Sequence, residues 1–522
     1  MKLQKTLIAA VLMSCAALGH AVTLRVANQG DATSMDPQSL NEVLTLSMAS
    51  NIYEPLVARD KSLHLTPGLA TTWRRLKPTV WLFPLRKGVT FHDGTPFTAD
   101  DVVFTFNRAR GEGSDLGSMV GAIKEVRKVD DHTVEIETAS PLLILPDVIS
   151  QVYIMSRKWC EENKAERPVD RRKGIENTAS FKANGTGPYR LKERQPGHRT
   201  VLVRNGNYWG KIEGNVDEVI FTPISSDATR VAALLSGEID LMEPVPLQDV
   251  DRLKADPQIK VLQGPELRTI FLGMDQKRDE LTGSSVKGKN PLKDKRVRQA
   301  FYQAIDVEAI RTKVMRGAAT PTALMVGPGV NGFQPDLNKR LPYDPDAARK
   351  LLSDAGYPDG FSLVMNCPND RYVNDAAICQ AVAANLARIG VKVNLQVESK
   401  STYFPKVLRR DTSFYLLGWT PNTYDAHNAL LAVVQTPSGG AGTFNLGNYS
   451  NPKVDELIAK IQGETNPDTR MAEIREAMKL HQDDIGHIPL HQQALAWAMR
   501  KNVDVVQPGD NFMPFKWVTV KP

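Results

Sequence analysis

Cysteine is scarce in this chain, with four residues among 522. A chain of this length buries enough apolar surface to fold without disulfide or metal staples, so a disulfide scaffold is excluded. Glycine and proline, 36 and 33 residues, follow no period, which excludes a collagen-like chain. An excess of one charge is also lacking, because 65 basic side chains stand against 59 acidic ones. This balance does not favour nucleic acid as a partner.

Long apolar runs are missing beyond the N-terminus, where none approaches the ~20 residues that a membrane-spanning helix needs. Residues 1–21 have the pattern of a signal peptide: a positively charged start, an apolar stretch, and Gly19-His20-Ala21 as the cleavage site. The alternative is a lipoprotein box ending at Cys15, which would anchor the protein to a membrane. We favour cleavage after Ala21 because apolar residues continue beyond Cys15.

Three cysteines then remain, Cys160, Cys367 and Cys379. An odd and sparse set in an oxidising compartment allows at most one internal disulfide. The three lack the spacing of metal ligands, so we expect no metal site among them and favour buried thiols. Whether any two of them pair is left open.

Local patterns predict an α/β domain between residues 344 and 419. Asp344-Pro345 is typical of a helix start, and Asn374 is expected to cap a second helix that ends before Gly390. Apolar residues alternate with polar ones in two predicted strands, at 361–366 and 391–397, and residues 414–418 are expected to form a third strand. Strand, helix and strand in this order predict a βαβ unit with parallel strands. Earlier in the chain, Thr98 with Asp101 predicts a helix start.

Ligands of open α/β sheets bind beyond the carboxyl ends of the strands. The loop after the first of these strands carries Arg371 and Tyr372. The loop after the third carries Trp419, Asn422, Tyr424 and Asp425. These side chains are expected to form a polar and aromatic pocket. The alternative is that Trp419 belongs to the core and that the charges are solvated.

Several ordered motifs extend over most of the chain. They are Leu85-Arg-Lys-Gly-Val-Thr-Phe-His-Asp-Gly-Thr-Pro-Phe97, Gly185-Thr-Gly-Pro-Tyr189, Arg204-Asn-Gly-Asn-Tyr-Trp209, Leu235-Ser-Gly-Glu-Ile-Asp240, Val297-Arg-Gln-Ala300 and Ala355-Gly-Tyr-Pro-Asp-Gly-Phe361. In this order they resemble the extracytoplasmic solute-binding proteins of ABC importers, of the dipeptide and oligopeptide type (family 5).

The resemblance implies an α/β, periplasmic-binding-protein-like Venus flytrap of two lobes with an extra subdomain. It implies a first lobe of residues 22–55, 180–270 and 487–522, an extra subdomain of 56–179, and a second lobe of 271–486. It further implies a periplasmic monomer without catalytic residues or cofactors. The protein would capture a solute, most simply a peptide, and deliver it to an ABC permease in the inner membrane.

The resemblance also raises a question about the ligand. In peptide-binding relatives, an Asp three residues after the Trp of the pocket loop holds the ligand's α-ammonium group, and here that position is Asn422. Either Asp425 takes over this role, or the ligand has no free amino group. Arg371 resembles the Arg that binds the carboxylate of dipeptides. The alternatives are therefore an opine, an oligosaccharide, glutathione or a metal chelate.

A secreted hydrolase is the alternative from another class of protein, and only weak patterns favour it. Residues 283–290 approach a phosphate-binding loop, but Asn290 stands where a Ser or Thr is needed. His487 and His491 have the spacing of metal ligands, but Pro489 interrupts a helix there and no third ligand is evident. We therefore expect a polar loop and ordinary hydrogen-bonded histidines.

The mature protein is expected to begin at Val22, because signal peptidase cleaves after a small-x-small pattern. N-terminal sequencing of protein secreted by its own cells checks this. A chain that starts at a lipid-modified Cys15 would contradict the prediction.

Overall fold

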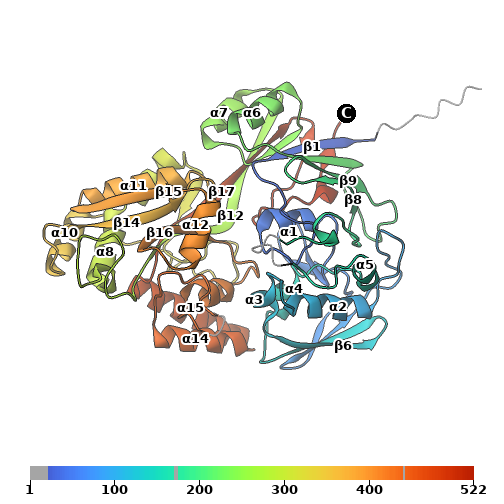
Figure 1. The fold of residues 1–522 in the computed structure, drawn as a ribbon, viewed down its shortest axis with the longest axis horizontal. Helices are drawn as coiled ribbons and strands as arrows, with labels where there is room; N and C mark the ends of the chain where they lie inside the picture. Colours follow the sequence, from blue (N-terminus) through green and yellow to red (C-terminus); the bar gives the residue numbers. More distant parts are fainter. Residues whose placement is uncertain (1–20, 170–174, 439–440) are drawn as a thin grey trace, which may run out of the picture.

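The computed structural model describes residues 21–169, 175–438 and 441–522. Nearly all of the expected signal peptide thus lies outside the described residues. Two lobes lie side by side and are joined by two long antiparallel strands, β12 (Ile259–Met274) and β17 (Ile488–Arg500) (Figure 1). Within the described part of the chain, no helix is long and apolar enough to cross a membrane.

One eleven-stranded sheet continues through both lobes. Its order is β15-β14-β16-β12-β17-β11-β1-β10-β9-β8, and β13 (Ala319–Pro321) pairs with β17 beside this path. The other strands are β1 (Thr23–Asn28), β8 (Tyr189–Gln195), β9 (Arg199–Arg204), β10 (Glu218–Pro223), β11 (Leu241–Glu243), β14 (Phe361–Pro368), β15 (Val391–Glu398) and β16 (Phe414–Trp419).

The pairing of β12 changes where the chain passes from one lobe to the other. Up to Pro265 it pairs with the part of β17 that lies in the first lobe, and from Thr269 it also pairs with β16 of the second lobe. The register breaks between these two residues. The register break lies close to the boundary at residues 270 and 271 that the resemblance implies.

The α/β unit predicted from residues 344–419 is confirmed. Strand β14 pairs in parallel with both β15 and β16, and helix α11 (Asp375–Ala387) connects β14 to β15. Asn374 is at the expected N-cap position of α11, but its side chain makes no capping hydrogen bond, because its backbone is left-handed and its amide donates to the carbonyl of Val314. The other helices of this lobe include α8 (Lys295–Ala304), α10 (Pro345–Asp354), α12 (Lys400–Leu408), α14 (Pro452–Gly463) and α15 (Pro467–Asp484).

The first lobe carries helices on both faces of its sheet. Helices α6 (Asp227–Ser236) and α7 (Val250–Ala255) lie above the sheet in Figure 1, and α1 (Val43–Ala49) lies below it. A four-stranded antiparallel sheet forms a separate layer at the lower edge, with the order β4-β5-β7-β6. Its strands are β4 (Arg74–Lys77), β5 (Val80–Pro84), β6 (Ile123–Asp130) and β7 (Thr133–Thr138). The same part of the chain forms the helices α2 (Ala99–Arg110), α3 (Gly117–Val120), α4 (Leu145–Ile149) and α5 (Arg157–Glu162) and the hairpin of β2 (Val57–Arg59) and β3 (Leu65–Pro67). The expected capping box of Thr98 and Asp101 is confirmed.

Two of the sequence motifs, at 185–189 and 204–209, stabilise the first lobe through hydrogen bonds to Glu54. The buried carboxylate of Glu54 accepts hydrogen bonds from Tyr208 (2.7 Å), Trp209 (2.7 Å) and Thr186 (2.9 Å). A buried carboxylate is tolerated when donors satisfy its oxygens. The motifs at 185–189 and 204–209 therefore identify the architecture and not the ligand.

The expectation of buried thiols was wrong for Cys367 and Cys379, which form a disulfide. It links the end of β14 to helix α11, while Cys160 remains a buried free thiol. The disulfide closes the loop that carries Arg371 and Tyr372, so it limits the freedom of two predicted site residues.

Candidate functional site

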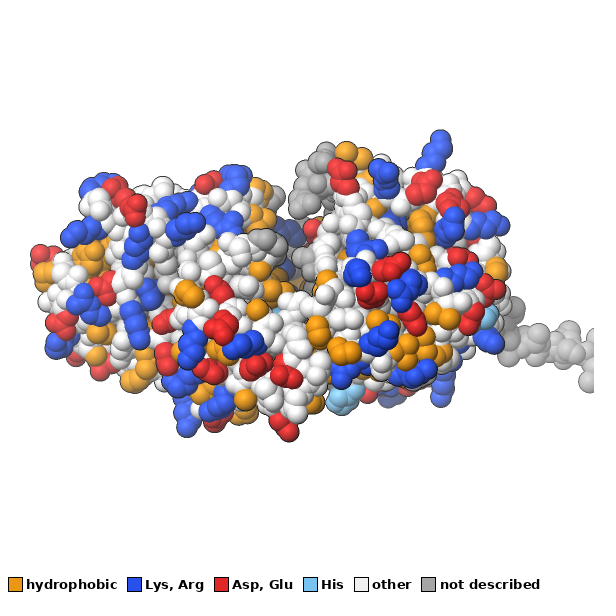
Figure 2. Space-filling view, turned by 90° about the horizontal axis from the view of Figure 1, so that it is seen from below, with side chains coloured by type: hydrophobic (Ala, Val, Ile, Leu, Met, Phe, Trp, Pro, Cys, Tyr) orange, Lys and Arg blue, Asp and Glu red, His pale blue; other side chains and the backbone are white. Residues whose placement is uncertain are grey.

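The two lobes turn the carboxyl ends of their parallel strands toward each other. Strand β12 runs from the first lobe into the second, and β16 is antiparallel to it, so β16 and β14 point toward the first lobe. Strand β17 runs in the opposite direction, and β11 is antiparallel to it, so β11 and its parallel neighbour β1 point toward the second lobe. The surface is hollowed between the lobes (Figure 2). This is where open α/β sheets bind ligands.

The loop after β14 presents a half-buried Arg371. The carboxylate of Asp375 accepts from the backbone N–H groups of Arg371 and Tyr372, both at 3.0 Å, and fixes the turn. The guanidinium of Arg371 lies 5.1 Å from the ring of Tyr372 and makes no hydrogen bond within the described residues. An Arg with unused donors on a fixed loop suits a carboxylate.

The loop after β16 is organised by Asn428. Its Oδ1 accepts from Nε1 of Trp419 at 2.9 Å, and its amide donates to Oδ1 of Asn422 at 2.8 Å. Trp419 also packs against Phe444, with 4.7 Å between the ring centroids. Trp419 and Asn422 are both half-buried, so each keeps a face that a ligand can reach.

Asp425 is engaged inside the second lobe. Its two carboxylate oxygens accept from the guanidinium of Arg470 at 2.8 and 2.9 Å, and Oδ2 also accepts from Asn331 at 2.7 Å. Oδ1 caps helix α13 (Ala426–Ala429) through the N–H of His427. The side chain is 1% exposed. These contacts favour a structural role, and an ammonium partner at Asp425 stays a prediction that the geometry does not favour.

Tyr424 points out of the second lobe and into the first. Its hydroxyl donates to Oδ2 of Asp510 at 2.6 Å and accepts from Gln151 at 3.3 Å. The guanidinium of Arg59 covers its ring at 3.9 Å. Burial raises the pKa of the Asp510 carboxyl. Tyr424 therefore joins the lobes, and its only hydroxyl proton is already donated to Asp510.

Sequence reasoning missed a charged group on the connecting strands. The guanidinium of Arg268 pairs with Oε1 of Glu266 at 2.9 Å, and Gln493 donates to Oε2 of Glu266 at 2.7 Å. Oε1 of Gln493 then accepts from the N–H of Val373, in the loop of Arg371. The network ties that loop to β12 and β17. The signal for it, Glu266-x-Arg268 within a strand, was hidden because charged residues seldom occur in buried strands.

The two histidines set aside in the sequence differ from each other. Nδ1 of His487 lies 2.9 Å from Nε2 of His481, as expected of a hydrogen-bonded histidine. His491 is buried and neither ring nitrogen has a partner within the described residues, so that expectation was wrong for His491. Burial lowers the pKa of His491 to about 3, and the ring is neutral.

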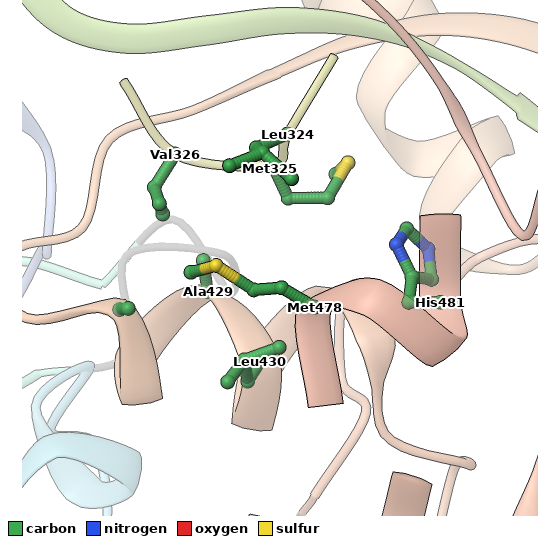
Figure 3. Close-up of a pocket in the computed structure, with 8 residues that line it drawn as sticks. Leu324, Met325, Val326, Ala429, Leu430, Met478 and His481 are labelled. Atoms are coloured by element: carbon green, nitrogen blue, oxygen red, sulfur yellow. The ribbon is translucent and has the colours of Figure 1, made fainter. Parts of the chain in front are cut away.

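An enclosed cavity inside the second lobe is not a solute site. Leu324, Met325 and Val326 face Leu430, Met478 and His481 across it (Figure 3). Its volume is about 10 Å³, which is no more than one water needs. The lining is mainly apolar, so the space between the lobes remains the candidate site.

The comparisons with known proteins agree with this geometry. A family model described as "Bacterial extracellular solute-binding proteins, family 5 Middle" matches residues 64–440. The Glutathione-binding protein GsiB of Escherichia coli is 24% identical over 502 residues, covering 95% of this chain and 93% of that protein. The Dipeptide-binding protein of Escherichia coli is 25% identical over 527 residues, covering 95% of each chain.

The fold has a similar counterpart among solved structures. The "ABC transporter-associated periplasmic binding protein DppA from Helicobacter pylori in complex with peptide STSA" superposes with a TM-score of 0.82. It is 24% identical, and the match covers 96% of this chain and 98% of that one.

Tyr424→Phe is expected to loosen the contact between the lobes. A hydrogen bond to a charged group contributes roughly 1.5–3 kcal/mol, and the variant loses the one to Asp510. Amide hydrogen exchange should therefore become faster in residues 145–152 and 505–515. Tyr403→Phe is the matched control, because that hydroxyl donates to the Leu416 carbonyl within the second lobe. Wild-type exchange rates in both segments of Tyr424→Phe would contradict the prediction.

Proposed function

Because the chain belongs to the bacterial extracellular solute-binding proteins of family 5, we propose that it is the solute-binding subunit of an ABC importer and that its solute is a peptide. The observation that carries this proposal is the opposition of the carboxyl ends of the strands across two connecting strands. The printed name of the dipeptide-binding relative supports a peptide, whereas the name of the glutathione-binding relative supports glutathione, one of the alternatives.

The proposed mechanism is closure around the ligand. A ligand that touches both lobes only when they are close shifts an existing equilibrium between open and closed forms. Arg371 and Trp419 would contact it from the second lobe, with Asn422 beside them. We assign residues 22–55, 180–270 and 487–522 to the first lobe, 56–179 to its extra subdomain, and 271–486 to the second lobe.

The proposal includes a place in the cell. Export through residues 1–21 would deliver a monomer to the periplasm, where the closed form docks on the permease in the inner membrane. No cofactor and no catalytic residue is assigned.

A non-peptide polar solute is the second candidate, and one observation favours it. Asn422 carries no charge, and Asp425 is paired with Arg470, so the pocket loop of the second lobe offers no free carboxylate to an ammonium group. An opine, an oligosaccharide or a metal chelate would not need one there.

Incubation with alanine peptides of two to five residues tests the function. A peptide at 100 times its Kd should stabilise the protein by about 2.7 kcal/mol, measured as a higher midpoint of thermal unfolding. Mass spectrometry should recover the peptides intact, whereas a hydrolase would release fragments. No stabilisation by any peptide, with stabilisation by an opine or a sugar, would favour the second candidate.

A variant at Asp425 is a poor test of ammonium binding. Removing its charge leaves Arg470 buried without a partner, at a cost of about 3–5 kcal/mol of folding stability whatever the ligand is. Acetylation of the peptide's amino group changes only the ligand, so comparison of free and N-acetylated peptides is the cleaner measurement.

A further inference from the structure

The first lobe holds a buried carboxylate that the framework does not use. Glu243 is the last residue of β11, at a carboxyl end that points toward the second lobe. Glu243 is 6% exposed. It therefore occupies, on the first lobe, the same topological position that Trp419 occupies on the second.

The amide of Asn511 is a side-chain donor to Glu243 that lowers its pKa. Oδ1 of Asn511 accepts from Nε1 of Trp497 at 3.1 Å, so the NH₂ group is the part of this amide that remains for Glu243. Glu54, the other buried glutamate of this lobe, has three donors. A carboxylate with two oxygens accepts up to about four hydrogen bonds, so Glu243 has capacity left.

Among the described residues, the cation that lowers the pKa of Glu243 is bonded to other groups. Arg230 is the positive group that acts on it, but that guanidinium donates to the carbonyls of Ile224 and Pro244 and pairs with Asp227 at 2.6 Å. Arg268 is occupied by Glu266.

Two carboxylates act on Glu243. Glu266 of β12, which is paired with Arg268, and Glu42, which caps α1, both raise the pKa of Glu243, although burial is the larger cause, and together they bring it to about 8. Burial without a neutralising cation disfavours the ionised form of a carboxyl group. Carboxyl groups in such surroundings are common at binding sites.

We propose that Glu243 binds a cationic group of the ligand, an ammonium or a guanidinium, while Arg371 on the opposite lobe binds its anionic group. The inference rests on the proposed function and specifies the ligand as a zwitterion. The positive end lies against the first lobe, which is the reverse of the orientation that an ammonium partner at Asp425 would impose. Closure then brings two opposite charges of the protein onto one ligand from two sides, and each lobe contributes one ion pair.

Glu243→Gln is the variant that tests the proposal, with tri-alanine and N-acetyl-tri-alanine as probes. The variant should bind tri-alanine roughly 10- to 100-fold more weakly than wild type, since it loses a charge-assisted hydrogen bond. Its affinity for the acetylated peptide should equal that of wild type. Glu54→Gln is the matched control: a buried glutamate of the same lobe whose loss should lower the unfolding midpoint and leave the ratio of the two affinities unchanged.

The stability of the ligand-free variant separates a binding residue from a structural one. Because the folded protein holds a proton on Glu243 up to about pH 8 and the unfolded chain releases it near pH 4, the folding stability of the wild type falls as the pH rises between these values. Glu243→Gln cannot ionise, so at pH 8 its unfolding midpoint should be at or above that of wild type. A lower midpoint at pH 8 would overturn the proposal.

Proton release gives a readout that packing does not affect. At pH 7 Glu243 is mostly protonated, so an incoming ammonium should expel close to one proton. Calorimetry in two buffers of different ionisation enthalpy measures this number, which should be zero for Glu243→Gln. Wild-type affinity for tri-alanine in the variant overturns this inference alone. If wild type binds no peptide at all, the proposed function fails, and this inference fails with it.

Discussion

The antiparallel pairing of β12 and β17 determines how the two lobes face each other. The parallel strands of each lobe pair with one of these two strands, either directly or through a neighbouring strand, and this pairing sets the direction in which they run. Since the connecting strands run in opposite directions, the strands they organise point at each other across the space between the lobes. A single continuous sheet therefore has two edges that face each other, and we propose that the chain bends between Pro265 and Thr269, where the register breaks, when these edges approach.

Local structure was predictable where neighbouring residues decide it. The alternation in residues 361–366 and 391–397 and the caps at Thr98 and Asp344 predicted elements that the structure contains. The absence of a capping hydrogen bond from Asn374 was not predictable in the same way. The side chain of Asn374 bonds to Val314, some 60 residues earlier in the chain, and such a contact leaves no trace in the local sequence.

The candidate site was predictable only in part, for the same reason. The position of the loops after strands indicated Arg371 and Trp419 as site residues. It could not show that Asp425 forms an ion pair with Arg470, or that Tyr424 donates a hydrogen bond to Asp510. Both partners come from distant segments. Glu243 and the Glu266–Arg268 pair were missed because the strands that carry them, β11 and β12, were not recognised in the sequence.

Closure around a ligand is the central claim, and small-angle X-ray scattering measures it directly. The radius of gyration of the full chain would be determined alone and with a peptide that mass spectrometry shows to be bound. Closure of the lobes predicts a smaller radius of gyration in the complex. An unchanged radius with the bound peptide present would contradict the account.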